Sequence, residues 1–408
     1  ERSGAAGAGE CAGSNSPLMA AGARSAARRG SVSKRRRPAA KKPARHVLRP
    51  ITRRMYMLFY ARLAALLLVS LFIVAILVSV MPVLFFYRRK WRLLIDNFQA
   101  LWVNSLLWLL PKQYLELYGD LPDASLRPKI IIANHQCDVD WVFLWMLARM
   151  TNRGQCDRSG SVKIMLKKEV QYIPVCGWGC YLFDFIFLRR KWEADKHIIE
   201  DKLIQFCQDE QPLWIFLFPE GTTINQRSLT KSRSFALETN RPLLDNLLLP
   251  RVRGLQHVLA VLNEHSPHAP EIFDLTMSFE SYSGEIPTWE AAYSRNVDVL
   301  VPNFTKLIMG TSSQRVAIDS QRFCYREMLS SGVDLQQWLD DRWLRKERLM
   351  KNFAEHEHFP TGECGMPVTV PIFGSIWRSL AAVCFYLALW AGMVFTYVKY
   401  MQDGDGFF

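Results

Sequence analysis

The feature that most constrains this chain is an uncharged apolar run of 25 residues, 63–87. Arg62 precedes the run and Arg88 follows it directly. About 20 apolar residues are enough for a helix to cross the hydrocarbon layer of a bilayer. The sequence therefore predicts a membrane-spanning helix over 63–87.

Two further apolar stretches extend this membrane pattern. Residues 97–110 carry two tryptophans but are too short for a span, so they predict an interfacial or re-entrant helix. Residues 379–398 are uncharged and lie between an arginine and a lysine, which predicts a second, C-terminal membrane span. We therefore expect a membrane anchor over 55–111 and a second span with a short tail over 367–408.

The basic residues of the chain are concentrated at its start. Residues 1–54 hold 14 Lys and Arg against two Glu, whereas the whole chain has a net charge of +13. This segment is rich in Ala, Ser and Gly and has no apolar period, so we expect a disordered basic tail. Four interpretations are compatible with the basic run 34–37: a transit peptide, a nuclear signal, a patch that binds anionic lipids, and a plain solvated tail. The remaining chain is close to neutral, so no nucleic-acid partner is expected.

Residues 112–366 alternate short β-type runs with helical stretches, which predicts an α/β domain around a largely buried sheet. The sequence shows no internal repeat and no Gly-rich phosphate loop. The expected strands cover 130–133, 185–188, 213–218 and 273–279, and the expected helices cover 141–149, 193–207 and 335–353.

The segment 134–140 (Asn-His-Gln-Cys-Asp-Val-Asp) stands between an apolar β-type run and a helix-length apolar stretch. His135 and Asp140 would point apart within one helix, so they meet only if His135 lies in the turn and Asp140 opens the helix. The carboxylate would then orient the imidazole, leaving its other nitrogen to take a proton from a hydroxyl. The alternative is a turn histidine beside acidic residues that favour a helix N-terminus.

The segment 218–222 (Phe-Pro-Glu-Gly-Thr) ends another apolar run. Its Pro and Gly predict a tight turn in which Glu220 holds neighbouring donors and free backbone N–H groups bind phosphate. Taken alone, the segment is also compatible with any turn that ends a strand.

Four blocks in this order resemble the 1-acylglycerol-3-phosphate acyltransferases, a lysophospholipid acyltransferase family. They are Asn-His-x4-Asp at 134–140, the Arg-bearing block at 187–192, Phe-Pro-Glu-Gly-Thr at 218–222 and Leu-Pro-Arg-x-x-Gly at 249–254. The Arg-Lys-Trp ending of the second block is similar to the eukaryotic long-chain branch, which includes lysophosphatidate, lysocardiolipin and lysophosphatidylinositol acyltransferases. The resemblance covers most of the chain beyond the basic tail.

The resemblance implies a glycerolipid acyltransferase-type α/β domain with a central mixed sheet between the two anchors. His135, oriented by Asp140, would deprotonate the acceptor hydroxyl, and acyl-CoA would be the co-substrate, with no metal and no further cofactor. The residues that the resemblance assigns to substrate binding are Asn134, Lys167, Arg190, Glu220, Gly221, Thr222, Pro250 and Arg251.

The chain departs from the family pattern at two positions. Asp184 stands where many members open the Arg-bearing block with Gly, and Thr223 stands where many have Arg. The second change removes a cation expected to meet the acceptor phosphate. Arg227, Lys231 or Arg233 are the candidates to replace it.

Other reactive residues give weaker patterns. The nine cysteines form no Cys-x-x-Cys pair, so buried, reduced thiols are expected. Cys137 as a nucleophile is disfavoured, since nothing in the spacing orients it towards His135. The pairs at 265–268 and 356–358 have short, metal-like His spacings without a second ligand pair, which favours polar loops.

Three functions follow from these observations. The first is acyl transfer from acyl-CoA to 1-acyl-sn-glycerol-3-phosphate, giving phosphatidic acid. The second is the same chemistry on lysocardiolipin or lysophosphatidylinositol, and the third is an inactive membrane-anchored lipid-binding scaffold. We expect an integral membrane protein of the endoplasmic reticulum with its catalytic domain facing the cytosol, or of another organelle if the tail is a transit peptide. Its partners would be membrane lipids, and the sequence does not indicate an oligomeric state.

Overall fold

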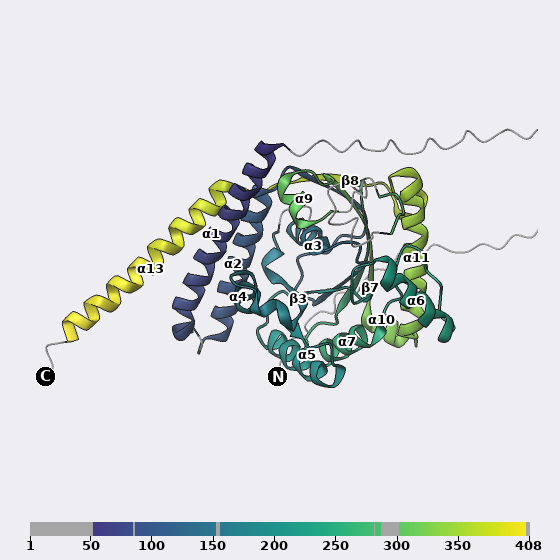
Figure 1. Cartoon of the computed structure of the whole chain (residues 1–408). Helices are drawn as coiled ribbons and strands as arrows, with labels where there is room; N and C mark the ends of the chain where they lie inside the picture. Colours follow the sequence, from purple (N-terminus) through teal and green to yellow (C-terminus); the bar gives the residue numbers. More distant parts are fainter. Residues whose placement is uncertain (1–51, 85, 152–155, 281, 287–301, 405–408) are drawn as a thin grey trace, which may run out of the picture. The chain divides into compact units, whose positions relative to one another are not determined.

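An eight-stranded mixed sheet forms the centre of the fold, so the α/β class predicted from the sequence is confirmed. The strands lie in the order β4-β3-β5-β2-β6-β7-β1-β8, and β3, β7 and β8 are labelled in Figure 1. The pairs β6–β7 and β1–β8 are antiparallel, and the other five are parallel. In chain order the strands are β1 (Gln113–Gly119), β2 (Lys129–Ala133), β3 (Val162–Lys167), β4 (Ile186–Leu188), β5 (Trp214–Leu217), β6 (Glu271–Phe279), β7 (Arg315–Cys324) and β8 (Val368–Ile372).

The computed structural model describes residues 52–84, 86–151, 156–280, 282–286 and 302–404. Apart from 52–54, the tail predicted over 1–54 lies outside these residues. The described helices longer than a single turn are α1 (Arg53–Leu84), α2 (Arg88–Leu109), α3 (Asp140–Arg149), α4 (Cys176–Leu182), α5 (Trp192–Gln208), α6 (Gln226–Glu238), α7 (Val252–His265), α9 (Phe304–Met309), α10 (Tyr325–Ser330), α11 (Leu335–His356) and α13 (Ile376–Gly404).

The strand β2 places the first motif at the middle of the sheet. All five of its side chains are buried, which fits a β-branched run between two parallel neighbours, β5 and β6. The chain leaves β2 at Ala133, makes a turn, and enters α3 at Asp140. The motif therefore lies at the carboxyl end of a central strand, where open α/β sheets commonly place their sites.

One face of β6 is polar and packs against α11. In β6, Asp274, Thr276 and Ser278 share a face because side chains alternate along a strand. The Lys346 Nζ of α11 lies 2.6 Å from Asp274 Oδ1, and both side chains are fully buried. Burial alone would raise the pKa of Asp274, but Lys346 and Arg342 hold it below its ordinary value. The helix α11 is thus fixed to the sheet by buried charges.

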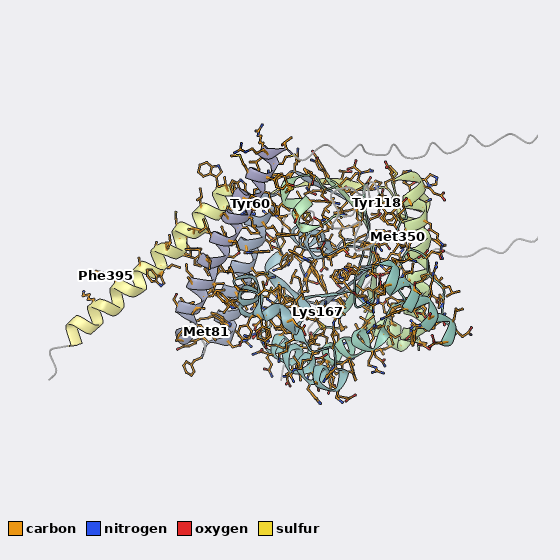
Figure 2. All side chains as sticks on the ribbon, in the orientation of Figure 1. Tyr60, Met81, Tyr118, Lys167, Met350 and Phe395 are labelled. Atoms are coloured by element: carbon orange, nitrogen blue, oxygen red, sulfur yellow. The ribbon has the colours of Figure 1, made fainter. Side chains whose placement is uncertain are left out.

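The helices α1 and α2 share the hydrophobic core of the sheet. Leu66, Ile73 and Leu77 of α1 belong to the same buried cluster as Ile130 to Ile132 of β2. Figure 2 marks the two ends of α1 at Tyr60 and Met81. The helix predicted over 97–110 is the second half of the 22-residue α2, most of which is buried. The anchor segment is therefore part of the folded unit.

Among the described residues, only α1 is long and apolar enough to cross a membrane, judged by length and composition. The apolar part of α13 described in the structure, 376–392, falls short of that length. The beginning of α13 is fixed on α2, where the Asn104 amide donates to Ser375 O at 2.9 Å and to Ser379 Oγ at 2.8 Å. The second membrane span thus stays a prediction.

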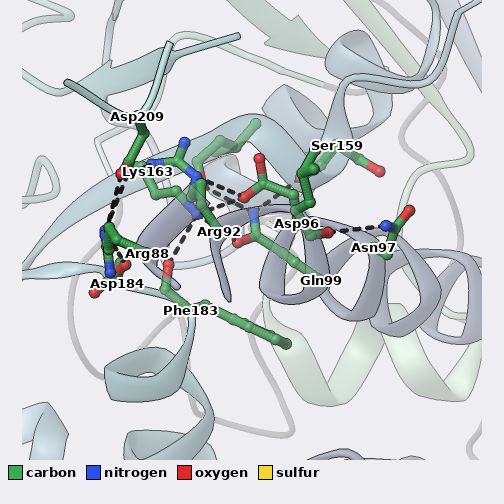
Figure 3. Close-up of polar contacts among 12 residues, drawn as sticks. Arg88, Arg92, Asp96, Asn97, Gln99, Ser159, Lys163, Phe183, Asp184 and Asp209 are labelled. Carbon is green, nitrogen blue, oxygen red and sulfur yellow. Dashed lines mark hydrogen bonds and ion pairs between the residues drawn. The ribbon is translucent and has the colours of Figure 1, made fainter. Parts of the chain in front are cut away.

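A buried network of charged side chains joins α2 to the edge of the sheet that holds β3 and β4 (Figure 3). Arg88 at the start of α2 donates to Asp184 Oδ2 at 2.7 Å and to Asp209 Oδ2 at 3.1 Å. Lys163 of β3 donates to Asp96 Oδ1 at 3.2 Å and to the carbonyl of Phe183 at 2.9 Å. Burial lowers the pKa of Lys163 to about 8.

Candidate active site

The centre of the candidate site is a hydrogen bond between His135 and Asp140. The Nδ1 of His135 lies 3.0 Å from Asp140 Oδ2, with His135 in the turn after β2 and Asp140 as the first residue of α3. This is the geometry that the spacing predicts. With Nδ1 protonated and donating to the carboxylate, Nε2 is left as the proton acceptor, and the ring is 19% exposed. The catalytic role of the pair stays a prediction.

The turn between His135 and Asp140 donates several hydrogen bonds to the Asp140 carboxylate. Its Oδ2 also accepts from the backbone N–H groups of Gln136 at 2.7 Å and Cys137 at 3.0 Å. The thiol of Cys137 donates to the other oxygen, Oδ1, at 2.9 Å. Asp140 is buried, so these donors replace the water that an exposed carboxylate would bind.

The second motif holds His135 from the other side. The Phe218 ring stacks on the imidazole with 4.2 Å between centroids, and Glu220 Oε1 accepts from the His135 backbone N–H at 3.2 Å. After the turn, Ile224 N–H donates to the carbonyl of His135 at 3.1 Å. The strand end at β5 therefore fixes both the ring and the backbone of the proposed base.

Glu220 is buried, and its contacts differ from the substrate-binding role that the resemblance implies. Besides His135, it accepts from the Leu248 N–H at 3.2 Å and from Trp343 Nε1 at 3.4 Å. Burial raises its pKa to about 8, although these N–H donors act in the opposite direction. Glu220 thus holds neighbouring donors in place, as the turn predicts, and its part in substrate binding stays a prediction.

Two exposed arginines converge on Gly221. Arg190 Nη2 lies 3.5 Å from the Gly221 carbonyl, and a Cβ added to Gly221 would lie 3.7 Å from Arg251 Nε. Gly221 has a φ of +74°, which glycine adopts without strain, and it is solvent-exposed like its neighbour Thr222. Lys167 is exposed at the end of β3, where it pairs in register with Leu188. Arg190 and Arg251, which meet at Gly221 in the turn after β5, are called the basic rim below.

Arg190 itself has an unusual backbone, with a φ of +61°. Such a conformation costs a non-glycine residue free energy and persists when the surrounding structure imposes it. Asp195 imposes it here, because its carboxylate accepts from the N–H groups of Arg189 at 2.7 Å and Lys191 at 3.0 Å. The hydrogen bonds of Asp195 therefore fix the turn from which the Arg190 side chain projects.

The remaining predicted residues have structural contacts. The Asn134 amide donates to Met277 O at 2.9 Å and accepts from Met277 N–H at 2.8 Å, so both of its polar atoms are used. Pro250 is buried, and its carbonyl accepts from Arg241 Nη2 at 2.9 Å. Of the candidates to replace a cation at Thr223, Arg233 is paired with Asp245.

The sequence did not indicate the part that α11 plays in this site. Trp343 contacts Glu220, and Glu347 accepts from the N–H of Asn246 at 3.0 Å. The Gln136 side chain in turn donates to the carbonyl of Asn246 at 3.2 Å. These partners are separated by 100 residues or more, so no local pattern could have found them. Among the residues that the structure describes, no three His, Cys, Asp or Glu side chains gather into a possible metal site.

Comparison with known proteins identifies the family. Residues 118–250 match a family model described as Acyltransferase, and residues 306–385 match one described as Acyltransferase C-terminus. The chain belongs to the acyltransferase family that includes the 1-acyl-sn-glycerol-3-phosphate acyltransferases and lysocardiolipin acyltransferase. The first match covers the dyad and Arg190 but ends one residue before Arg251, and the second covers α11 and most of the described apolar part of α13.

Two relatives and one solved structure illustrate the similarity. The probable 1-acyl-sn-glycerol-3-phosphate acyltransferase 5 of Arabidopsis thaliana is 29% identical over 57% of this chain and 55% of its own length. Lysocardiolipin acyltransferase 1 of Mus musculus is 28% identical over 76% of this chain and 77% of its own length. The crystal structure of the 1-acyl-sn-glycerophosphate acyltransferase PlsC from Thermotoga maritima is 15% identical, covers 72% of this chain and 97% of that one, and has a TM-score of 0.36. This chain thus spans about half of the plant relative.

Proposed function

We propose that the protein transfers a fatty acyl group from acyl-CoA to the free hydroxyl of a lysophospholipid. The observation that carries this proposal is the His135–Asp140 pair at a strand end with the arginines 190 and 251 converging beside it at Gly221. A base alone would suit many reactions. A base next to exposed guanidinium groups suits an acceptor that carries a phosphate.

In the proposed reaction, His135 Nε2 takes the proton of the acceptor hydroxyl while Asp140 stabilises the imidazolium that forms. The hydroxyl oxygen attacks the thioester carbonyl carbon and forms a new C–O bond. The tetrahedral intermediate then collapses, the C–S bond breaks, and the CoA sulfur receives the proton from Nε2. The products are a diacyl phospholipid and free CoA, with no net proton change.

The acceptor that we propose first is 1-acyl-sn-glycerol-3-phosphate, whose phosphate would lie against Arg190, Arg251 and Lys167. A remodelling reaction on lysocardiolipin or lysophosphatidylinositol is the second candidate. It is favoured by Thr223, which supplies no charge where many family members have arginine, and by the similarity to lysocardiolipin acyltransferase 1.

We also propose that the protein is attached to a membrane through α1, with a second attachment at α13. Support comes from the apolar composition of α1, of which only 28% of the most apolar window is buried. Acyl-CoA is a cytosolic solute, so the site would face the cytosol, in our proposal at the endoplasmic reticulum. Protease protection in sealed microsomes tests this: cleavage of the α/β domain from outside is expected, and full protection would contradict it.

An acceptor panel tests the reaction itself. Full-length protein in nanodiscs would be given labelled oleoyl-CoA with lysophosphatidic acid, lysocardiolipin, lysophosphatidylinositol or lysophosphatidylcholine. Turnover on lysophosphatidic acid alone supports the first acceptor, and preference for one of the next two supports the second candidate. No turnover on any acceptor, with retained lipid binding, would identify a scaffold.

The matched variants are His135→Ala and His356→Ala. His356 is exposed on α11 and does not contact the dyad, so its loss is expected to leave turnover unchanged. His135→Ala is expected to abolish acyl transfer while thermal unfolding stays cooperative. Unchanged turnover in that variant would contradict the mechanism.

A further inference from the structure

The Asp140 carboxylate has an unequal set of hydrogen bonds. Its Oδ2 accepts from three groups: His135 Nδ1 and the backbone N–H groups of Gln136 and Cys137. Its Oδ1 accepts from a single described group, the Cys137 thiol, at 2.9 Å. Asp140 is 2% exposed, so water has little access to that oxygen. The Cys137 thiol is therefore the one described hydrogen-bond donor to Asp140 Oδ1.

The surroundings of Cys137 keep its thiol protonated. The residue is 3% exposed, and burial followed by the Asp140 carboxylate raises the pKa of the thiol well above its ordinary value. A thiolate is the nucleophilic form of cysteine, and this site opposes it. The nucleophile alternative for Cys137 therefore has no support in the structure, whereas a role as hydrogen-bond donor is supported by its 2.9 Å contact with Asp140 Oδ1.

We propose that Cys137 is a positioning residue of the dyad: its thiol holds Asp140 Oδ1 and thereby sets how readily Asp140 stabilises protonated His135. This rests on the proposed function of His135 as a general base. A donor to the charged form of a carboxylate spreads its negative charge and weakens its hold on other protons. Without the donor, Asp140 would hold the imidazolium more strongly, and His135 would be free to act as a base only at higher pH.

The test compares Cys137→Ala with Cys137→Ser in the full-length protein. Cys137→Ala is expected to move the acidic limb of the kcat/KM profile to higher pH by about half a unit or more. Serine places an O–H donor at the same position, so the acidic limb of the Cys137→Ser profile is expected to lie at the wild-type pH. An unchanged limb in Cys137→Ala, or equal loss of turnover in both variants, would overturn the proposal.

Cys364→Ala is the matched control. Cys364 is also a buried thiol, 4% exposed, and it lies near the carboxylate of Asp319 away from the dyad. Its removal is expected to cost packing without moving the pH profile. A similar shift in Cys364→Ala would show that the effect of Cys137 is a general loss of packing, and would also overturn the proposal.

A second readout needs no substrate, so it separates this proposal from the proposed function. Acylation of His135 by diethylpyrocarbonate, followed on its peptide by mass spectrometry, reports the pH at which the imidazole becomes neutral. Cys137→Ala is expected to move that midpoint to higher pH, whether or not the protein transfers acyl groups. In an Asp140→Asn background the same substitution is expected to have no effect. A midpoint that does not move, or moves equally without Asp140, would contradict the proposal.

Discussion

At the scale of single residues, Glu220 joins three distant parts of the site. Its oxygens accept from His135 after β2, Leu248 before α7 and Trp343 in α11. It has no neighbouring cation among these contacts, so its charge is compensated only by N–H dipoles. The stability of the fold should therefore respond to the ionisation of this one carboxyl.

We predict that Glu220 makes the protein less stable as pH rises. Burial raises the pKa of Glu220 from 4.5 to about 8, so folding favours its protonated form. The stability from this group is then fully present below pH 4.5 and is lost as pH rises towards 8. The slope is at most about 1.4 kcal/mol of unfolding free energy per pH unit. Thermal unfolding from pH 5 to 9 measures it, and Glu220→Gln should flatten the curve; equal slopes would contradict the prediction.

A second prediction concerns Asn134, whose amide forms two hydrogen bonds with the Met277 backbone. Asn134→Ala leaves a buried N–H and C=O of Met277 without these partners, at a cost of about 2 to 4 kcal/mol in stability. The KM for the acceptor should stay unchanged in the protein that remains folded. A higher KM at an unchanged melting temperature would instead show that Asn134 binds substrate.

The basic rim leads to a third prediction. Loss of Arg190 or Arg251 removes a charge-assisted hydrogen bond to the acceptor phosphate, so each alanine variant should raise the KM for the acceptor about 10-fold to 100-fold. Arg253→Ala is the control, since Arg253, in the first turn of α7, stacks over Trp192 at the start of α5. Steady-state kinetics at saturating acyl-CoA gives the values. A fall in kcat with an unchanged KM would place these arginines in the chemical step.

What the sequence could and could not reveal about the site depends on the distance between partners. His135 and Asp140 lie five residues apart, so turn geometry alone indicates their contact. The contacts of Glu220 join residues 28 to 123 positions apart, and those of Asn134 span 143. No local periodicity records such pairs. The resemblance to the family found the right segments, but the contacts of individual side chains became clear only from the fold.

At the scale of elements, the short strand β4 is flanked on each side by a residue with a left-handed backbone conformation. Asp184 before it has a φ of +59° and Arg190 after it has a φ of +61°. The preference for Gly at the first position in many family members has a physical reason here, because glycine adopts this conformation without strain. In this chain, Asp184 instead gains ion pairs with Arg88 at 2.7 Å (Figure 3) and with Lys202 at 3.1 Å.

Our fourth prediction separates the cost of the left-handed backbone at Asp184 from the stabilisation by its ion pairs. Asp184→Gly loses the ion pairs and keeps the backbone conformation, whereas Asp184→Ala loses both. The alanine variant should therefore be less stable than the glycine variant by about 1 kcal/mol. Melting temperatures of the two variants measure this difference. Equal stability would show that the backbone of Asp184 relaxes without cost.

The elements that the sequence predicted correctly are those with simple apolar patterns, such as β2, β5 and β6. The strand β7 was missed because its buried residues include Asp319 and Ser320, which carry no apolar alternation. The strand β8 was missed because it is an exposed edge strand that contains Pro371. Both strands pair with β1, which lies far away in the sequence.

At the scale of the whole unit, α1 has two faces with different surroundings. One face contributes to the core of the α/β domain, and Arg62 Nη1 donates to the carbonyl of Ile308 at 2.6 Å. Much of the other face is exposed, including Leu68 and Val78. A helix that only anchored a separate domain would not need the first face. The domain and its proposed anchor are therefore expected to fold together.

The last prediction follows from this arrangement and concerns two truncations. Residues 1–51 are rich in Ala, Ser, Gly and basic residues and have no apolar period, so their removal should leave folding and acyl transfer unchanged. Removal of residues 1–84 deletes α1 as well and uncovers the apolar face of α2 against which it packs, including the partly buried Trp102, whose Nε1 donates to Ser70 of α1 at 2.8 Å. Exposed apolar surface of this kind favours aggregation, so the shorter protein should elute in the void volume of a gel-filtration column unless detergent is present. A soluble, monomeric and active 85–408 fragment would contradict the prediction, because it would show that α1 serves only as an anchor and contributes nothing to the stability of the domain.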